Sequence, residues 1–120
     1  MKTFERDGKI NFVDDNNVIV GFDNEGQCCE SFGHFLSRKI PSAIDEGAEN
    51  LDTEDFNFDT EFFKEVKPTI DSYNETEMAV FRLQKGNEEM FLTLHNTHNG
   101  YYSHGFKMDV GGVKVRDGYL

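Results

Sequence analysis

The C-terminal third constrains the fold most, because its strand-forming runs are joined by links too short for anything but antiparallel neighbours. EMAVFRLQ (77–84), EEMFLTLH (88–95) and GYYSHGFKMDV (100–110) are rich in β-branched and aromatic residues. Parallel strands need a crossover of roughly a dozen residues, whereas a hairpin closes with two. We therefore expect an antiparallel meander here, with Gly111-Gly112 as a turn or a bulge before a candidate last short strand.

Asn99-Gly100 is the strongest hairpin signal in the chain, because a type I′ turn needs two residues with positive φ. If these two residues form the loop, His95 lies opposite His104 and Thr93 lies opposite Phe106. Opposed side chains in such a pair are about 5 Å apart at Cβ. The register predicts two adjacent histidines on an otherwise apolar face.

The N-terminal third also indicates strands. KINFV (9–13) and NVIVGFD (17–23) are separated by the turn-forming cluster Asp14-Asp15-Asn16-Asn17, and QCCES (27–31) is a candidate third strand. SFGHFLSRKI (31–40) fits either a short helix or an irregular edge segment.

The middle of the chain, about 41–77, is an acidic excursion between the two strand regions. Thr60 resembles a helix N-cap before EFFKEV (61–66), so we expect one short helix near 60–66, ended by Pro68. The predicted fold is α+β: a mainly antiparallel sheet of about five to seven strands, one or two short helices and the acidic excursion, in a single domain spanning 1–120.

Composition supports a globular chain. With 120 residues, twelve Phe and no Trp, Phe must dominate the core. No apolar run approaches the roughly 20 residues that a membrane span needs, and the N-terminus lacks the apolar core of a signal peptide. We expect a cytoplasmic protein, without membrane contact, whose two cysteines are reduced.

Charge is the strongest functional signal. The formal net charge is −11, and residues 41–77 alone carry −10, from twelve acids and two bases. Clustered Lys and Arg, which phosphate contacts require, are lacking, so direct nucleic-acid binding is not expected. The segment can attract a basic protein partner, or it can be merely a solvated insertion. Candidate partner-binding residues are Asp52, Glu54, Asp55 and Asp59.

The histidine pair allows a second hypothesis. Two imidazoles on opposed strands can share a divalent metal ion, joined by His34 or Cys28, whereas the alternative is that each ring is hydrogen-bonded locally in the sheet. No spacing in the chain matches an established zinc motif. We expect no metal and no cofactor, with His95 and His104 as the alternative ligands.

Cys28-Cys29-Glu30 is the other conspicuous cluster. Neighbouring residues of a strand point to opposite faces, so one thiol is expected in the core and the other at the surface. A nucleophilic thiol would need a base such as His34, His95 or His104 beside it. Motifs for phosphate binding, serine hydrolysis and zinc proteolysis are missing from the sequence.

Two stretches together resemble a known family. Cys28-Cys29-Glu30-Ser31 and the later Asn99-Gly100-Tyr101-Tyr102-Ser103 are similar to motifs of small uncharacterised bacterial and phage domains, in which Ser stands where this chain has His98. The resemblance implies a mostly β, α+β fold and a bacterial or phage source, and no particular chemistry. It suggests that the two motifs meet in space, as a candidate cluster of Cys28, Cys29, Glu30, His95, Tyr101, Tyr102 and His104.

The sequence therefore favours a small non-enzymatic interaction or regulatory protein whose acidic surface engages a basic partner or imitates nucleic acid. The alternative is a small metal- or thiol-dependent enzyme that uses Cys28 or Cys29 with His95 and His104. Exposed strand edges are compatible with a monomer or a homodimer.

Overall fold

The computed structural model describes residues 1–24, 31–42, 51–66, 75–98 and 104–120, and these segments contain nine strands and no helix. The predicted α+β class with short helices is therefore wrong, and the described fold is all-β. The strands are β1 (Lys2–Arg6), β2 (Lys9–Val13), β3 (Val18–Asp23), β4 (Ser31–Ser37), β5 (Asn57–Val66), β6 (Glu75–Lys85), β7 (Glu88–His98), β8 (Gly105–Val110) and β9 (Val113–Tyr119).

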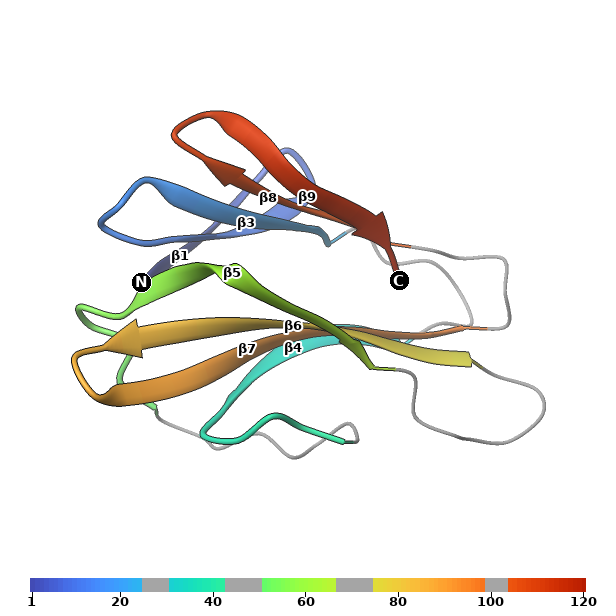
Figure 1. Cartoon of the computed structure of the whole chain (residues 1–120). Helices are drawn as coiled ribbons and strands as arrows, with labels where there is room; N and C mark the ends of the chain where they lie inside the picture. The colour runs from blue at the N-terminus through green and yellow to red at the C-terminus, as the bar shows by residue number, and fades with distance from the viewer. Residues whose placement is uncertain (25–30, 43–50, 67–74, 99–103) are drawn as a thin grey trace.

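The strands form two antiparallel sheets that pack face to face as a sandwich (Figure 1). One sheet has the order β1-β2-β3-β8-β9, and the other has the order β4-β7-β6-β5. The chain crosses between the sheets after β3 and again after β7. The predicted strands at 9–13, 77–84 and 88–95 are confirmed within β2, β6 and β7.

Two hairpins of the five-stranded sheet have two-residue turns. Asp7 and Gly8 have φ of 54° and 73°, and Gly111 and Gly112 have φ of 59° and 85°. Two consecutive positive φ values define the type I′ turn, whose twist matches that of the strands. Of the two alternatives for Gly111-Gly112, a turn or a bulge, the structure has the turn, whereas β1 and its Asp7-Gly8 turn were not predicted.

The segment predicted as a helix at 60–66 lies inside β5. Adjacent side chains of a strand point to opposite faces, and both faces of β5 meet aromatic rings. The Phe63 ring lies 5.4 Å from Phe81 in the core, whereas Phe62 lies 5.6 Å from Phe91 on the outer face. A seven-residue helix has only marginal stability by itself, and aromatic packing on both faces stabilises the strand instead.

The predicted β7–β8 hairpin is also wrong. β7 pairs with β4 along one edge and with β6 along the other, over all eleven residues of β6. A strand has only two hydrogen-bonding edges, so β8 pairs instead with β3 and β9 in the other sheet. The segment SFGHFLSRKI, left open between a helix and an edge segment, contributes β4 at the edge of the four-stranded sheet.

The core between the sheets is rich in phenylalanine, as the composition predicted. Phe12, Phe22 and Phe106 of the five-stranded sheet meet Phe58 and Phe81 of the four-stranded sheet. The Phe81 ring lies 6.1 Å from Phe106 in an edge-to-face arrangement, a geometry that aromatic pairs favour.

Asp14, in the β2–β3 turn, links the two sheets through its buried carboxylate. One oxygen accepts the backbone N–H groups of Asn16 and Val18, each at 2.9 Å. The other accepts the N–H of Phe58, at the start of β5, at 2.8 Å. Hydrogen bonds to charged groups are among the stronger ones in proteins, so this carboxylate fixes the position of β5 against the turn.

Candidate functional site

The predicted cluster is only partly within the described residues. Cys28, Cys29, Glu30, Tyr101 and Tyr102 lie outside them, and of the cluster the structure places His95 and His104.

His104 is buried at the end of the sandwich, with 1% of its surface exposed. Its ring stacks on Phe32 at 4.2 Å, and its Nδ1 is 2.8 Å from the carbonyl oxygen of Asp23. Its backbone N–H and carbonyl pair with Leu120 at 2.8 and 2.9 Å. His104 therefore joins β3, β4 and the last residue of the chain.

His95 lies on the outer face of the four-stranded sheet, away from His104. It pairs with Gly33 and Met78, and a Cβ atom at Gly33 would be only 3.2 Å from its Nε2. Phe32, the stacking partner of His104, faces the opposite, inner side. The predicted opposition of His95 and His104 is wrong, since their strands do not pair. Among the described residues, no group of three or more His, Cys, Asp or Glu could hold a metal ion.

His34, the third histidine considered, faces the core side of β4 and lies 5.0 Å from the Phe12 ring. Desolvation lowers its pKa below the ordinary 6.5.

The predicted acidic residues divide into two groups. Asp52, Glu54 and Asp55 are exposed on the turn that precedes β5, whereas Asp59 is 3.5 Å from Arg82 in an ion pair. Arg82 also contacts Glu89 at 3.0 Å, so Asp59 and Glu89 share one guanidinium within the fold.

The acidic turn is held in place from several sides. The Phe56 N–H donates to the Thr53 carbonyl at 3.2 Å, and Asp55 has a positive φ of 65°, as the third residue of a type II turn does. The Asp52 carboxylate accepts the Glu54 N–H at 2.9 Å, and the Met1 nitrogen donates to the Thr53 carbonyl at 2.8 Å. Phe56 is buried beneath the turn.

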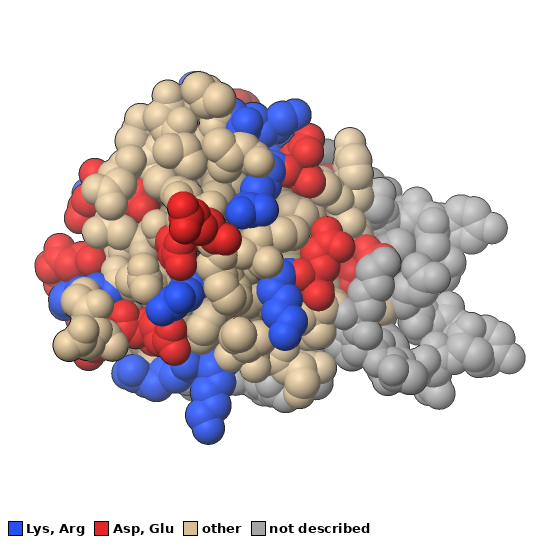
Figure 2. Space-filling model, in the orientation of Figure 1, with Lys and Arg blue, Asp and Glu red and all other residues tan. Residues whose placement is uncertain are grey.

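The fold brings further acids to the same end of the sandwich. The Asp15 N–H donates to the Asn57 side chain at 3.2 Å, which places the β2–β3 turn beside β5. The β6–β7 turn also lies here, because Asn57 pairs with Gln84. Figure 2 shows red carboxylates over this end, interspersed with blue cations. We define the acidic end by the exposed residues Asp15, Asp52, Glu54, Asp55 and Glu88, next to the cation Lys85.

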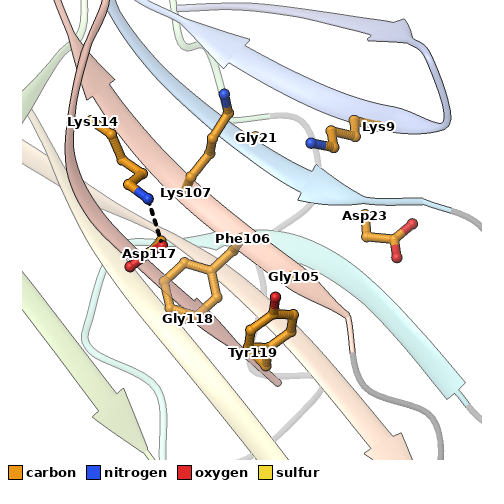
Figure 3. A pocket seen from close by; sticks show the side chains of 10 residues that line it. All are labelled: Lys9, Gly21, Asp23, Gly105, Phe106, Lys107, Lys114, Asp117, Gly118 and Tyr119. Carbon is orange, nitrogen blue, oxygen red and sulfur yellow. Dashed lines mark hydrogen bonds and ion pairs between the residues drawn. The ribbon is translucent and has the colours of Figure 1, made fainter.

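A separate hollow of about 310 Å³ lies on the outer face of the five-stranded sheet (Figure 3). Gly21 and Gly105 lie beneath it; a Cβ atom added at Gly21 would be 3.1 Å from the Asn11 side-chain oxygen, and one added at Gly105 would be 3.4 Å from the Tyr119 ring. Polar and aromatic side chains of four strands surround it: Lys9, Asp23, Lys107, Lys114, Asp117 and Tyr119. The sequence analysis missed this hollow, although alternation along β3 and β8 assigns Gly21, Gly105 and Lys107 to the solvent face.

The cations of the hollow are not equivalent. Lys114 donates to Asp117 at 2.9 Å, and this hydrogen bond raises the pKa of the Lys114 ammonium. Lys107 is 3.2 Å from Asp109. Lys9, in contrast, forms no ion pair with any residue that the structure describes. Figure 3 shows its ammonium directed across the sheet toward Gly21 and away from Asp23.

The described fold is thus an antiparallel β-sandwich with an acidic end and a lysine-lined hollow. The chain belongs to the family named domain of unknown function DUF7448, whose family model matches residues 1–108. Searches of curated proteins and of solved structures find no match.

The match extends over both motifs on which the family resemblance rested, and β9 lies beyond it. Within the described residues there is no helix able to cross a membrane.

Proposed function

We propose that this protein is a non-enzymatic binding module that engages a basic protein partner through its acidic end. The observation that supports the proposal is that three separate segments deliver exposed carboxylates to one end of the sandwich. Asp15 comes from the β2–β3 turn, Glu88 from the β6–β7 turn, and Asp52, Glu54 and Asp55 from the turn before β5.

The fixed backbone conformation of the acidic turn also supports the proposal. A charged surface attracts a partner over a longer range than any contact, and it binds more strongly when its side chains stand on a fixed backbone. The hydrogen bonds of Thr53 and the buried Phe56 ring fix this backbone. Asp59 plays no direct part in the proposal, because its carboxylate already pairs with Arg82 within the fold.

An oligolysine peptide is the probe that tests the proposal. Replacing three carboxylates together (Asp52→Asn, Glu54→Gln, Asp55→Asn) keeps the Asp52 acceptor oxygen and removes three charges. Exposed pairs contribute at most about 1 kcal/mol each, so we expect affinity to fall roughly tenfold, measured by titration calorimetry. Raising the salt concentration should weaken binding to the native chain more than binding to the variant.

A matched control removes three exposed charges elsewhere: Glu5→Gln, Asp7→Asn and Glu65→Gln. This control should retain the affinity of the native chain within a factor of about two. If both triple variants lose affinity equally, total charge governs the binding and the acidic end is not a site. Binding that is insensitive to salt would also contradict the proposal.

A further inference from the structure

We propose that the hollow on the outer face of the five-stranded sheet binds a small sugar that carries one anionic group, a phosphate or a carboxylate. The proposal is independent of the acidic end, which is formed by different residues. It rests on three features of the hollow: a cation without an ion pair, an exposed aromatic ring beside a bare backbone, and a size that suits one sugar ring.

The first argument is that the Lys9 ammonium, at the edge of the hollow, has no ion pair among the described residues. The chain has 23 acids and 12 Lys and Arg residues, so each cation has an excess of available carboxylates. Lys9 is nevertheless without an ion pair among the described residues, although Asp23 is its neighbour across the sheet. Lys107 crosses above Gly21, where its Cγ would be 3.9 Å from an added Cβ. Lys107 is paired with Asp109 at 3.2 Å, so the Lys9 ammonium is the donor that the hollow offers to an anion.

The aromatic ring is the second argument. Tyr119 is 76% exposed and pairs with Gly105, and its ring would lie 3.4 Å from a Cβ added there. The ring thus lies against the glycine at one side of the hollow (Figure 3). An exposed ring beside bare backbone offers an apolar platform with a polar tip, onto which the C–H face of a sugar can pack.

Size and polarity are the third argument. A volume of about 310 Å³ is near the lower limit for ligand pockets, which fits one monosaccharide better than a larger molecule. The carboxylates of Asp23 and Asp117 can accept hydrogen bonds from sugar hydroxyls. Lys114 and Lys107 are each paired with an aspartate, Asp117 and Asp109, which leaves the single charge of Lys9 for a ligand with one anionic group.

Four probes are compared: glucose 6-phosphate, glucuronate, glucose and inorganic phosphate. They distinguish a phosphate from a carboxylate as the anionic group, and binding of that group from binding of the sugar ring. We expect glucose 6-phosphate or glucuronate to shift the amide resonances of Gly21, Lys107 and Tyr119 in a two-dimensional NMR titration. Whichever of the two binds more tightly identifies the anion. Glucose and phosphate alone should each bind at least about tenfold more weakly. Phosphate that binds as tightly as the phosphorylated sugar would overturn recognition of the ring.

Variants assign the binding to the hollow. Lys9→Met and Tyr119→Ala should each weaken binding about five- to tenfold, whereas Lys9→Arg keeps the charge and should retain it. Lys64→Met removes an exposed lysine from the other sheet and is the matched control, expected to bind as the native chain does. Thermal melting confirms that each variant is folded. Equal binding by Lys9→Met, Tyr119→Ala and the native chain, or failure of both charged sugars to bind, would overturn the proposal.

Discussion

The two sheets of the sandwich differ in how they use their two faces. In the four-stranded sheet, Phe81 and Leu94 on the inner face and Val80 and Thr93 on the outer face all have no exposed surface. In the five-stranded sheet the inner residues are equally buried, but the outer face carries lysines, aspartates and glycines around the hollow. One sheet therefore has apolar packing on both faces, and the other carries polar side chains on its outer face. The predictions below test this division.

Truncating the centre of the four-stranded sheet should have the largest effect. Phe81 packs against Phe58, Phe63 and Phe106, so Phe81→Ala removes contacts with both sheets. We expect a loss of about 3–5 kcal/mol in the free energy of unfolding, measured by urea denaturation. Ile19→Ala, on the outer face of the five-stranded sheet, is the comparison and should lose far less. Equal losses would contradict the division between the sheets.

Cutting the link between the sheets should have the next largest effect. Asp14→Ala leaves three backbone N–H groups without their acceptor, and we expect it to cost about 2–4 kcal/mol. Asp14→Asn retains one acceptor oxygen, so its free energy of unfolding should lie between those of Asp14→Ala and the native chain. A denaturation midpoint for Asp14→Ala within error of the native value would show that the link contributes nothing.

A substitution on the outer face of the four-stranded sheet should stabilise the protein. The Thr93 hydroxyl is buried without a hydrogen-bond partner in the described part of the chain. Thr93→Val replaces it by a methyl group of similar size, and a buried unpaired hydroxyl costs about 1 kcal/mol or more. We expect the melting temperature to rise in calorimetry. A fall would show that this face is more hydrated than the structure indicates.

The smallest effect concerns His34, at the edge of the four-stranded sheet. Burial lowers its pKa below 6.5 in the folded state, so the unfolded state binds the proton more readily. The stability that neutral His34 contributes is present above about pH 6.5 and is lost as the pH falls through that value. His34→Gln should reduce this loss slightly. An NMR titration that gives His34 a pKa of 6.5 or higher would contradict the assignment.

Two turn dipeptides show what a local sequence can and cannot determine. Asp7-Gly8 and Asn99-Gly100 carry the same kind of hairpin signal, and only the first joins two paired strands. The difference lies outside both dipeptides: β2 had a free edge for β1, whereas both edges of β7 are occupied by β4 and β6. A local signal can therefore suggest a turn, but it cannot decide which strand the chain pairs with next.

Strand content, the phenylalanine core and the concentration of acids could be predicted from the sequence, because each depends on residue type and local alternation. The alternation of β2 and β3 and the short link at 85–88 required no knowledge of distant residues. Three features needed the tertiary structure: the strand at β5, the separation of His95 from His104, and the gathering of Asp15 and Glu88 beside Asp52, Glu54 and Asp55. Each depends on which sheet edge or face a segment meets, and long-range packing outweighs the small free energies of local preference.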